Sequence, residues 1–118
     1  MNITDTKMMA KMNKALSFGG DLFSLDDIKE YLKDGRMQGH VENDTWAITQ
    51  VHEWPRKRSV NILYVIGNIE DSVKLEEKIV EWAKSIEADT LTAVGRDGWW
   101  EHILPGWKKI GTLYSKEL

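Results

Sequence analysis

The sequence predicts an α/β domain in which helices flank a mixed β-sheet. This prediction rests on helical apolar periodicity before residue 35, strand-like alternation between residues 37 and 67, and a long amphipathic helix after that. A chain of 118 residues has the size of one domain and can bury a core between two layers. We therefore expect a single domain over residues 1–118, with a variable N-terminal helical segment over 1–20 and a core over 24–118.

Two helices are expected ahead of the strands. Residues 5–16 carry a methionine-rich stripe at helical spacing behind Asp5, a residue that favours a helix start. We expect this stripe to face the core, and a docking face is the alternative. The second helix begins at Ser24, which with Asp27 resembles a capping box, and it ends at Gly35, where a left-handed cap is expected.

Three strands should follow as a meander. The first begins at residue 36 or 37, and the second, residues 45–53, alternates between two faces. Residues 60–67 (VNILYVIG) are apolar nearly throughout, which indicates a central strand covered on both faces. Turn-forming residues separate the strands at Asn43-Asp44 and at Pro55.

A strand–helix–strand unit is expected over residues 60–96. Its helix covers roughly residues 72–87, is capped by Asp71 or Ser72, and leads into a strand at 89–96. The two strands should be parallel and joined by a right-handed crossover, and they can splay at their carboxyl ends to leave a cleft.

Two shorter elements are expected to close the chain. Residues 98–104 suit a short helix that Pro105-Gly106 ends. Residues 107–118 suit a final strand, with Ile110, Leu113 and Tyr114 as its packing residues.

Composition excludes several functional classes. The chain has no cysteine, which rules out disulfides, thiolate nucleophiles and cysteine-based zinc sites. His40 and His52 match no known metal-ligand spacing with nearby acids, so no metal is expected. A net charge of −3 gives no reason to expect nucleic acid as a partner. No apolar run approaches the roughly 18–20 residues of a membrane span, so a soluble protein in the cytoplasm is expected.

Several stretches resemble a known family. "VEWAKSIEADTLTAVGR" and "WWEHILPGWKKIGTLYSKEL" resemble the later helices and strands of the GNAT superfamily of acetyl-coenzyme A dependent acyltransferases. "YLKDGRMQ", the "PRKR" turn and "GRDGW" are similar to small GNAT-like proteins of tailed bacteriophages and prophages. The resemblance covers about 95 residues from residue 24 onward, and it implies a GNAT-like fold truncated at the first strand of the family.

The resemblance assigns four residues to the cofactor loop: Ile66, Gly67, Asn68 and Ser72. The family's pattern there is Arg/Gln-x-x-Gly-x-Gly/Ala, whose backbone amides hold the diphosphate of coenzyme A. Gly67 is present, but the Arg/Gln and the second glycine are absent, and Glu70 and Asp71 stand where phosphate charges would lie. Each carboxylate opposes a diphosphate by about 1 kcal/mol in solvent and suits the helix N-terminus itself. We therefore expect no cofactor, or acetyl-coenzyme A if the protein is catalytic.

Two residues are candidates for catalysis. His102 lies four residues before Gly106, where the resemblance places a tyrosine general acid, and a histidine there could protonate a leaving thiolate. Glu53, at the end of the strand expected over residues 45–53, is the candidate general base. For both residues the alternative is a solvent-facing side chain.

Six residues are candidates for a contact surface: Trp54, Arg56, Lys57, Arg58, Trp99 and Trp100. The alternatives are tryptophans buried for packing and a basic turn kept solvated. The resemblance, together with the acidic cofactor loop, thus implies a phage-encoded GNAT-fold protein without catalysis that binds a protein of the virion or the host, in the host cytoplasm or in the virion. The alternative is an acetyl-coenzyme A dependent N-acetyltransferase acting on a protein or a small amine. Oligomeric state stays open.

Overall fold

The structure is a computed structural model, and it describes residues 1–2, 4–95 and 106–118. Its elements follow the order α1 (Thr6–Phe18), α2 (Leu25–Asp34), β1 (Gln38–Glu42), β2 (Thr45–Glu53), β3 (Arg58–Ile66), α3 (Ile69–Ser85) and β4 (Thr90–Ala93). The four strands form one sheet in the order β1-β2-β3-β4. The pairs β1–β2 and β2–β3 are antiparallel, and β3–β4 is parallel. The predicted fold class, an α/β domain with a mixed sheet and flanking helices, is confirmed.

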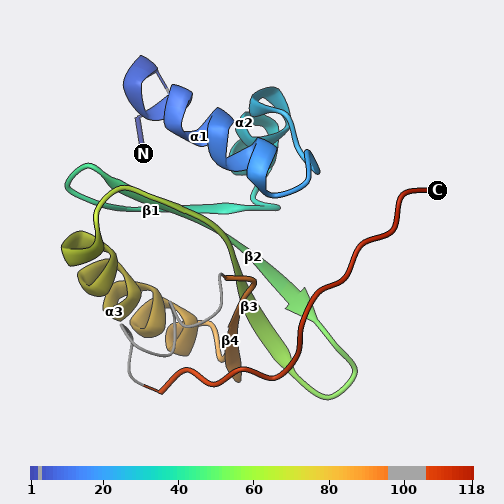
Figure 1. Cartoon of the computed structure of the whole chain (residues 1–118). Coiled ribbons are helices and arrows are strands. Elements are labelled where there is room, and N and C mark those ends of the chain that lie inside the picture. Colours follow the sequence, from blue (N-terminus) through green and yellow to red (C-terminus); the bar gives the residue numbers. More distant parts are fainter. Residues whose placement is uncertain (3, 96–105) are drawn as a thin grey trace.

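Helices cover both faces of this sheet. In Figure 1, α1 and α2 lie on one side and α3 lies on the other. The α1/α2 side buries a cluster made of Met8, Met12, Leu16, Ile28, Met37, Trp46, Ile48, Tyr64 and Ile66. The α3 side buries a second cluster made of Ala47, Val60, Ile62, Leu75, Ile79 and Ala83. Strand β3 contributes to both clusters, as its apolar sequence predicted, and the methionine stripe of α1 belongs to the core.

The first two helices begin as the sequence predicted, and α1 continues to Phe18, two residues past its predicted end. The carboxylate of Asp5 accepts hydrogen bonds from the first-turn amides of α1. Ser24 and Asp27 form a reciprocal capping box, and Gly35 ends α2 in the left-handed region at φ +85°.

The third helix starts earlier than predicted. Its N-cap is Asn68, so Asp71 and Ser72 lie inside the first turn instead of capping it. An asparagine is as good an N-cap as an aspartate, and Gly67 alone separates Asn68 from the end of β3. The sequence offered several capping residues in a row, and periodicity alone could not choose among them.

Strand β3 contains a bulge that changes which residues face α3. Ile48 opposes Tyr64, but Thr49 opposes Ile62, so Leu63 is an extra residue without a partner on β2. Ile62 therefore packs toward α3, whereas Tyr64 packs toward α1 and α2. Such an insertion locally bends the strand and re-aims the side chains beyond it.

The predicted final strand is wrong. Residues 107–118 adopt no regular secondary structure, and the three expected packing residues, Ile110, Leu113 and Tyr114, are 82%, 75% and 87% exposed. A strand needs a neighbouring strand to pair with as well as β-favouring residues, and this segment pairs with none of the described strands. Strand β4 is also shorter than predicted, and the predicted helix at 98–104 lies outside the described residues.

The sequence led us to expect neither a strand ahead of the first helix nor a helix that spans a membrane. Within residues 1–2, 4–95 and 106–118, no strand precedes α1. No helix among these residues has the length and apolar character needed to cross a membrane.

Candidate functional site

The cofactor loop assigned from the sequence is a tight connection between β3 and α3. Gly67 has φ +136°, and a Cβ built on it would lie 2.1 Å from Oγ1 and 2.6 Å from Cα of Thr45. Thr45 is fully buried at the start of β2, and its Oγ1 accepts a hydrogen bond from the amide of Asn68 at 3.1 Å. The close approach to Thr45 therefore accounts for a glycine at this position.

The N-terminus of α3 is capped by its own side chains. Asn68 Oδ1 accepts from the amide of Asp71 at 2.8 Å, and Asn68 Nδ2 donates to Asp71 Oδ2 at 2.8 Å. The other Asp71 oxygen accepts from Nδ2 of Asn43, in the β1–β2 turn, at 3.0 Å. The hydroxyl of Ser72 donates to the carbonyl oxygen of Asn68 at 2.7 Å. Side chains from the turn and the helix thus bond to one another around the first turn of α3.

This capping network carries negative charge. The hydrogen bonds from Asn43 and Asn68 lower the pKa of Asp71, so its carboxylate is ionised at neutral pH. Glu70 lies in the same first turn and is exposed. A helix N-terminus stabilises negative charge, and the carboxylates of Glu70 and Asp71 already lie in the first turn of α3.

Strands β3 and β4 separate at the residue where β3 bulges. Their pairing ends at Ile62 and Ala93, although β3 continues to Ile66. Leu63, the bulged residue, is the first residue of β3 beyond the last pair. Among the described residues, no strand lies beside 63–66 on the β4 side, which leaves their backbone amides and carbonyls on that side without a sheet partner.

Glu53 lies at the other end of β2 from this loop. Thr45 begins β2 and Glu53 ends it, so the two are roughly 27 Å apart along an extended strand. The Glu53 carboxylate pairs with the guanidinium of Arg58 across the β2–β3 hairpin. The structure does not bring Glu53 together with the residues that start α3. The other catalytic candidate, His102, lies outside the described residues.

The β2–β3 hairpin carries most of the predicted contact residues. Trp54 is 59% exposed, stacks on His52 with ring centroids 5.5 Å apart, and donates from Nε1 to Ser59 Oγ at 2.8 Å. Arg56 and Lys57 are exposed, and no ion pair found among the described residues involves either of them.

The remaining predicted contact residues differ in position. Arg58 is an anchor within the fold, because its guanidinium also donates to the carbonyl oxygen of Ile86 at the end of α3. Trp99 and Trp100 lie outside the described residues.

Sequence reasoning missed a partly buried chain of polar side chains that links β1 and β2. Gln38 donates from Nε2 to the Gly35 carbonyl, and its Oε1 accepts from Thr49 Oγ1 at 3.0 Å. Because that hydroxyl donates to Gln38, it accepts from Nε2 of His40 at 2.9 Å, so in the neutral ring the proton is on Nε2 and Nδ1 is unprotonated.

The surroundings of His40 agree with this neutral state. Its ring meets Trp82 edge-on at 5.0 Å, and burial lowers its pKa. The signal available in the sequence was alternation: Gln38 and His40 share one face of β1, and Thr49 lies across the hairpin from Gln38.

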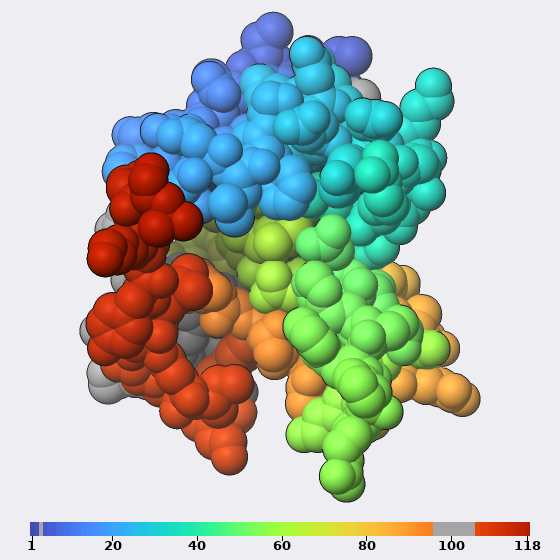
Figure 2. Space-filling view, turned by 90° about the vertical axis from the view of Figure 1, so that its right-hand side faces the viewer, coloured from blue at the N-terminus to red at the C-terminus, as the bar shows by residue number. Residues whose placement is uncertain are grey.

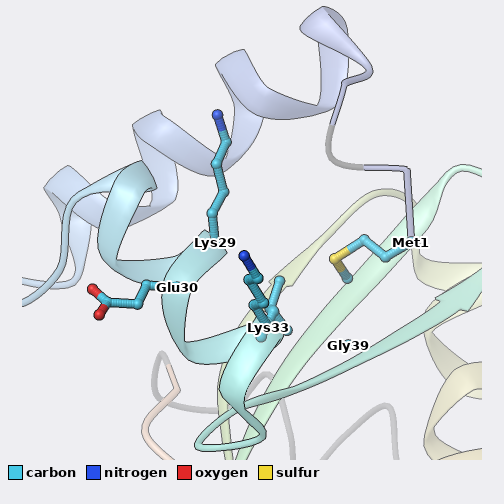
Figure 3. Close-up of a pocket in the computed structure, with 6 residues that line it drawn as sticks. Met1, Lys29, Glu30, Lys33 and Gly39 are labelled. Atoms are coloured by element: carbon cyan, nitrogen blue, oxygen red, sulfur yellow. The ribbon is translucent and has the colours of Figure 1, made fainter.

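A depression lies on the opposite face of the sheet from α3. It has a volume of about 670 Å³ and is lined by Met1, Lys29, Glu30, Leu32, Lys33 and Gly39. Figure 3 shows Met1 over β1 near Gly39, with Glu30 pointing away on the other side of α2. The Met1 methyl lies 3.0 Å from a Cβ built on Gly39, so Met1 fills the floor beside β1. This depression has no connection with the start of α3.

The part of the chain that the structure describes contains no candidate metal-binding site. There, no group of three or more histidine, aspartate or glutamate side chains is placed to hold an ion.

Comparisons of structure identify similar folds, whereas no family model and no curated protein matches the sequence. A tetramutant of the BH1408 protein from Bacillus halodurans has a TM-score of 0.67 at 12% identity, covering 100% of this chain and 97% of its own. A protein described as a probable acetyltransferase has a TM-score of 0.63 at 11% identity, covering 96% and 91%. The TTHA1254 protein from Thermus thermophilus has a TM-score of 0.56 at 16% identity, covering 80% and 78%. The chain therefore has an acetyltransferase-like fold.

Proposed function

We propose that this protein uses an acetyltransferase-like fold as a protein-binding module and does not transfer acyl groups. The observation that supports this proposal is the capped start of α3, where Asn68 and Asp71 hold each other and Asn43 holds Asp71 from the β1–β2 turn. A coenzyme A diphosphate would have to displace these hydrogen bonds and lie beside an ionised carboxylate. Each such charge opposes binding by about 1 kcal/mol in solvent and by more where water is excluded.

The surface that supports binding is the tip of the β2–β3 hairpin. It presents an exposed tryptophan ring beside two exposed cations, Trp54 with Arg56 and Lys57. Tryptophan and arginine are the side chains that most often dominate binding energy at protein interfaces. Figure 2 shows the hairpin (green) projecting from the body of the molecule, across a hollow from the C-terminal segment (red). The charge of the tip favours an acidic partner surface.

The source and location of the protein are part of the proposal. The stretches "YLKDGRMQ" and "GRDGW" support a bacteriophage or prophage protein, and the partner would then be a virion or host protein met in the host cytoplasm or in the particle.

A second candidate is an acetyl-coenzyme A dependent N-acetyltransferase that acts on a protein or a small amine. It is favoured by the parting of β3 from β4 after Ile62, which leaves the backbone of residues 63–66 able to pair with an extended ligand. The similar solved structures include a probable acetyltransferase, and a shared fold is weak support for a shared reaction.

Affinity purification with hairpin variants tests the binding proposal. Tagged wild-type protein would be isolated from infected cells and from intact particles, and the proteins that come with it would be identified. A partner is expected to be lost with the double variant Trp54→Ala, Arg56→Glu and to be kept with Lys11→Glu, a charge reversal of the same kind on exposed α1. A partner retained by both variants, or none bound to the wild type, would contradict the proposal.

A further inference from the structure

Strand β1 is an open edge of the sheet. It is the first strand in the order β1-β2-β3-β4, and only its β2 side is paired among the described residues. The amide and carbonyl of every second residue in Gln38–Glu42 therefore point away from the sheet. No residue of β1 is a proline, so each of them has a backbone donor. An edge of this kind can pair with an extended segment of another chain.

The depression lined by Met1 and Gly39 is bounded by this edge on one side and by α2 on the other. Leu32 Cδ2, from α2, lies 3.5 Å from a Cβ built on Gly39, and the Met1 methyl lies 3.0 Å from it. These apolar atoms form a floor beside the exposed Gly39. An extended peptide at a sheet edge gains affinity from main-chain hydrogen bonds and specificity from the side chains beside the edge.

The charges around the depression favour an acidic ligand. Lys29 and Lys33 are four residues apart, so they share one face of α2, and both are exposed. No ion pair found among the described residues involves either lysine. Glu30, the acid in the lining, has its Oε1 3.7 Å from Nη2 of Arg36 and points away from Met1 in Figure 3. The two lysines are therefore available to pair with carboxylates of a ligand.

The spacing of the lysines narrows the class of ligand. Residues four apart on an α-helix are separated by about 6 Å along its axis. Alternate residues of an extended strand lie about 6.6–6.8 Å apart and point to the same face. Two acidic residues separated by one residue would thus match Lys29 and Lys33. A strand without acids would leave both cations unpaired, and charges beside an edge discourage pairing with uncharged strands.

We infer that the depression between α2 and β1 binds an extended acidic peptide as an added strand. The main chain of the peptide pairs with Gln38–Glu42, and two acidic side chains, separated by one residue, pair with Lys29 and Lys33. The five residues of β1 span about 17 Å, which suits a peptide segment of the same length. This surface does not include the β2–β3 hairpin tip, so the inference is independent of the function proposed above.

Fluorescence anisotropy with a synthetic peptide tests the inference. The probe is a dye-labelled peptide of seven residues in which glutamate alternates with valine, and its control has lysine in place of glutamate. Saturable binding is expected for the first peptide and none for the second. The double variant Lys29→Glu, Lys33→Glu should weaken binding by about tenfold or more. Lys7→Glu, Lys11→Glu makes the same change at the same spacing on exposed α1 and should leave the affinity unchanged.

A second peptide separates strand addition from attraction between charges alone. Methylation of its backbone amides keeps the glutamates but removes the donors that would pair with β1, so the affinity should fall by about tenfold or more. An N-methylated peptide that binds as tightly as the unmodified one contradicts the inference. So does an unmodified peptide that fails to bind at millimolar concentration, or equal weakening by the α1 and α2 variants.

Light scattering checks for a different occupant, and circular dichroism checks that each variant is folded. The wild type and the α2 variant are expected to have the same mass. A wild type with the mass of two chains that falls to one chain in the folded α2 variant would assign the depression to a second copy and overturn the inference.

Discussion

Gly67 lies so close to Thr45 that a Cβ built on the glycine would come within 2.1 Å of the threonine hydroxyl oxygen. The same hydroxyl accepts from the amide of Asn68, so the last turn before α3 is fixed directly onto the start of β2. The close approach to Thr45 therefore explains why residue 67 is a glycine, although the resemblance places it in a phosphate-binding loop. Its presence alone gives no evidence for a bound cofactor.

Replacing this glycine should be costly. Gly67→Ala is expected to lower the free energy of unfolding by about 3 kcal/mol, because it combines a backbone clash with a positive φ. Gly35→Ala is the matched control: its φ is +85°, but nothing lies within 4 Å of an added Cβ, so a loss of about 1–2 kcal/mol is expected. Urea unfolding of both variants measures the difference. Equal losses would show that contact with Thr45 does not matter.

Arg58 should matter more to stability than Glu53. The Arg58 guanidinium joins β3 to the end of α3 through the Ile86 carbonyl, and Arg58→Ala is expected to cost about 1–3 kcal/mol. Glu53→Gln removes only an exposed ion pair and should cost less than about 1 kcal/mol. Chemical denaturation compares the two. If the protein proves to be an enzyme, loss of activity with unchanged stability in Glu53→Gln would support a general base at this position.

His40 should make the protein less stable in mild acid. Burial holds its pKa below the ordinary 6.5, so the unfolded chain takes up a proton at a higher pH than the folded one. Stability is therefore fully present above about pH 6.5 and declines as the pH falls through that value toward the folded pKa. His40→Gln, which keeps an amide donor for Thr49, should flatten this dependence. Thermal unfolding between pH 7 and pH 5 measures it, and an equal slope in both proteins would contradict the assignment to His40.

Local patterns in the sequence were sufficient for most of the fold. The capping box at Ser24, the alternation of residues 45–53 and the apolar run of β3 each depend on neighbours in the chain, and each was predicted correctly. The final strand failed because pairing depends on a distant edge, which residues 107–118 do not reach in the structure. The bulge at Leu63 was missed for a related reason: it exists only as a mismatch between two strands.

The candidate site was predictable only in part. The sequence placed Gly67, Asn68 and the acids of the first helical turn next to one another, because they are neighbours in the chain. It could not show that Asn43 reaches Asp71 from 28 residues away. The partners of Gly67 and His40 were hidden in the same way, since Thr45 and Thr49 approach them only when the strands pair.

We propose that Asn68 and Asp71 cap the start of α3 in place of a bound coenzyme A diphosphate. The most direct test is the melting temperature of the wild-type protein with and without millimolar acetyl-coenzyme A. A ligand at 100 times its dissociation constant stabilises a protein by about 2.7 kcal/mol, which raises the melting temperature of a domain this size by several degrees. We predict no shift. A shift of several degrees that Ser72→Glu abolishes would place the cofactor at the start of α3 and contradict the claim.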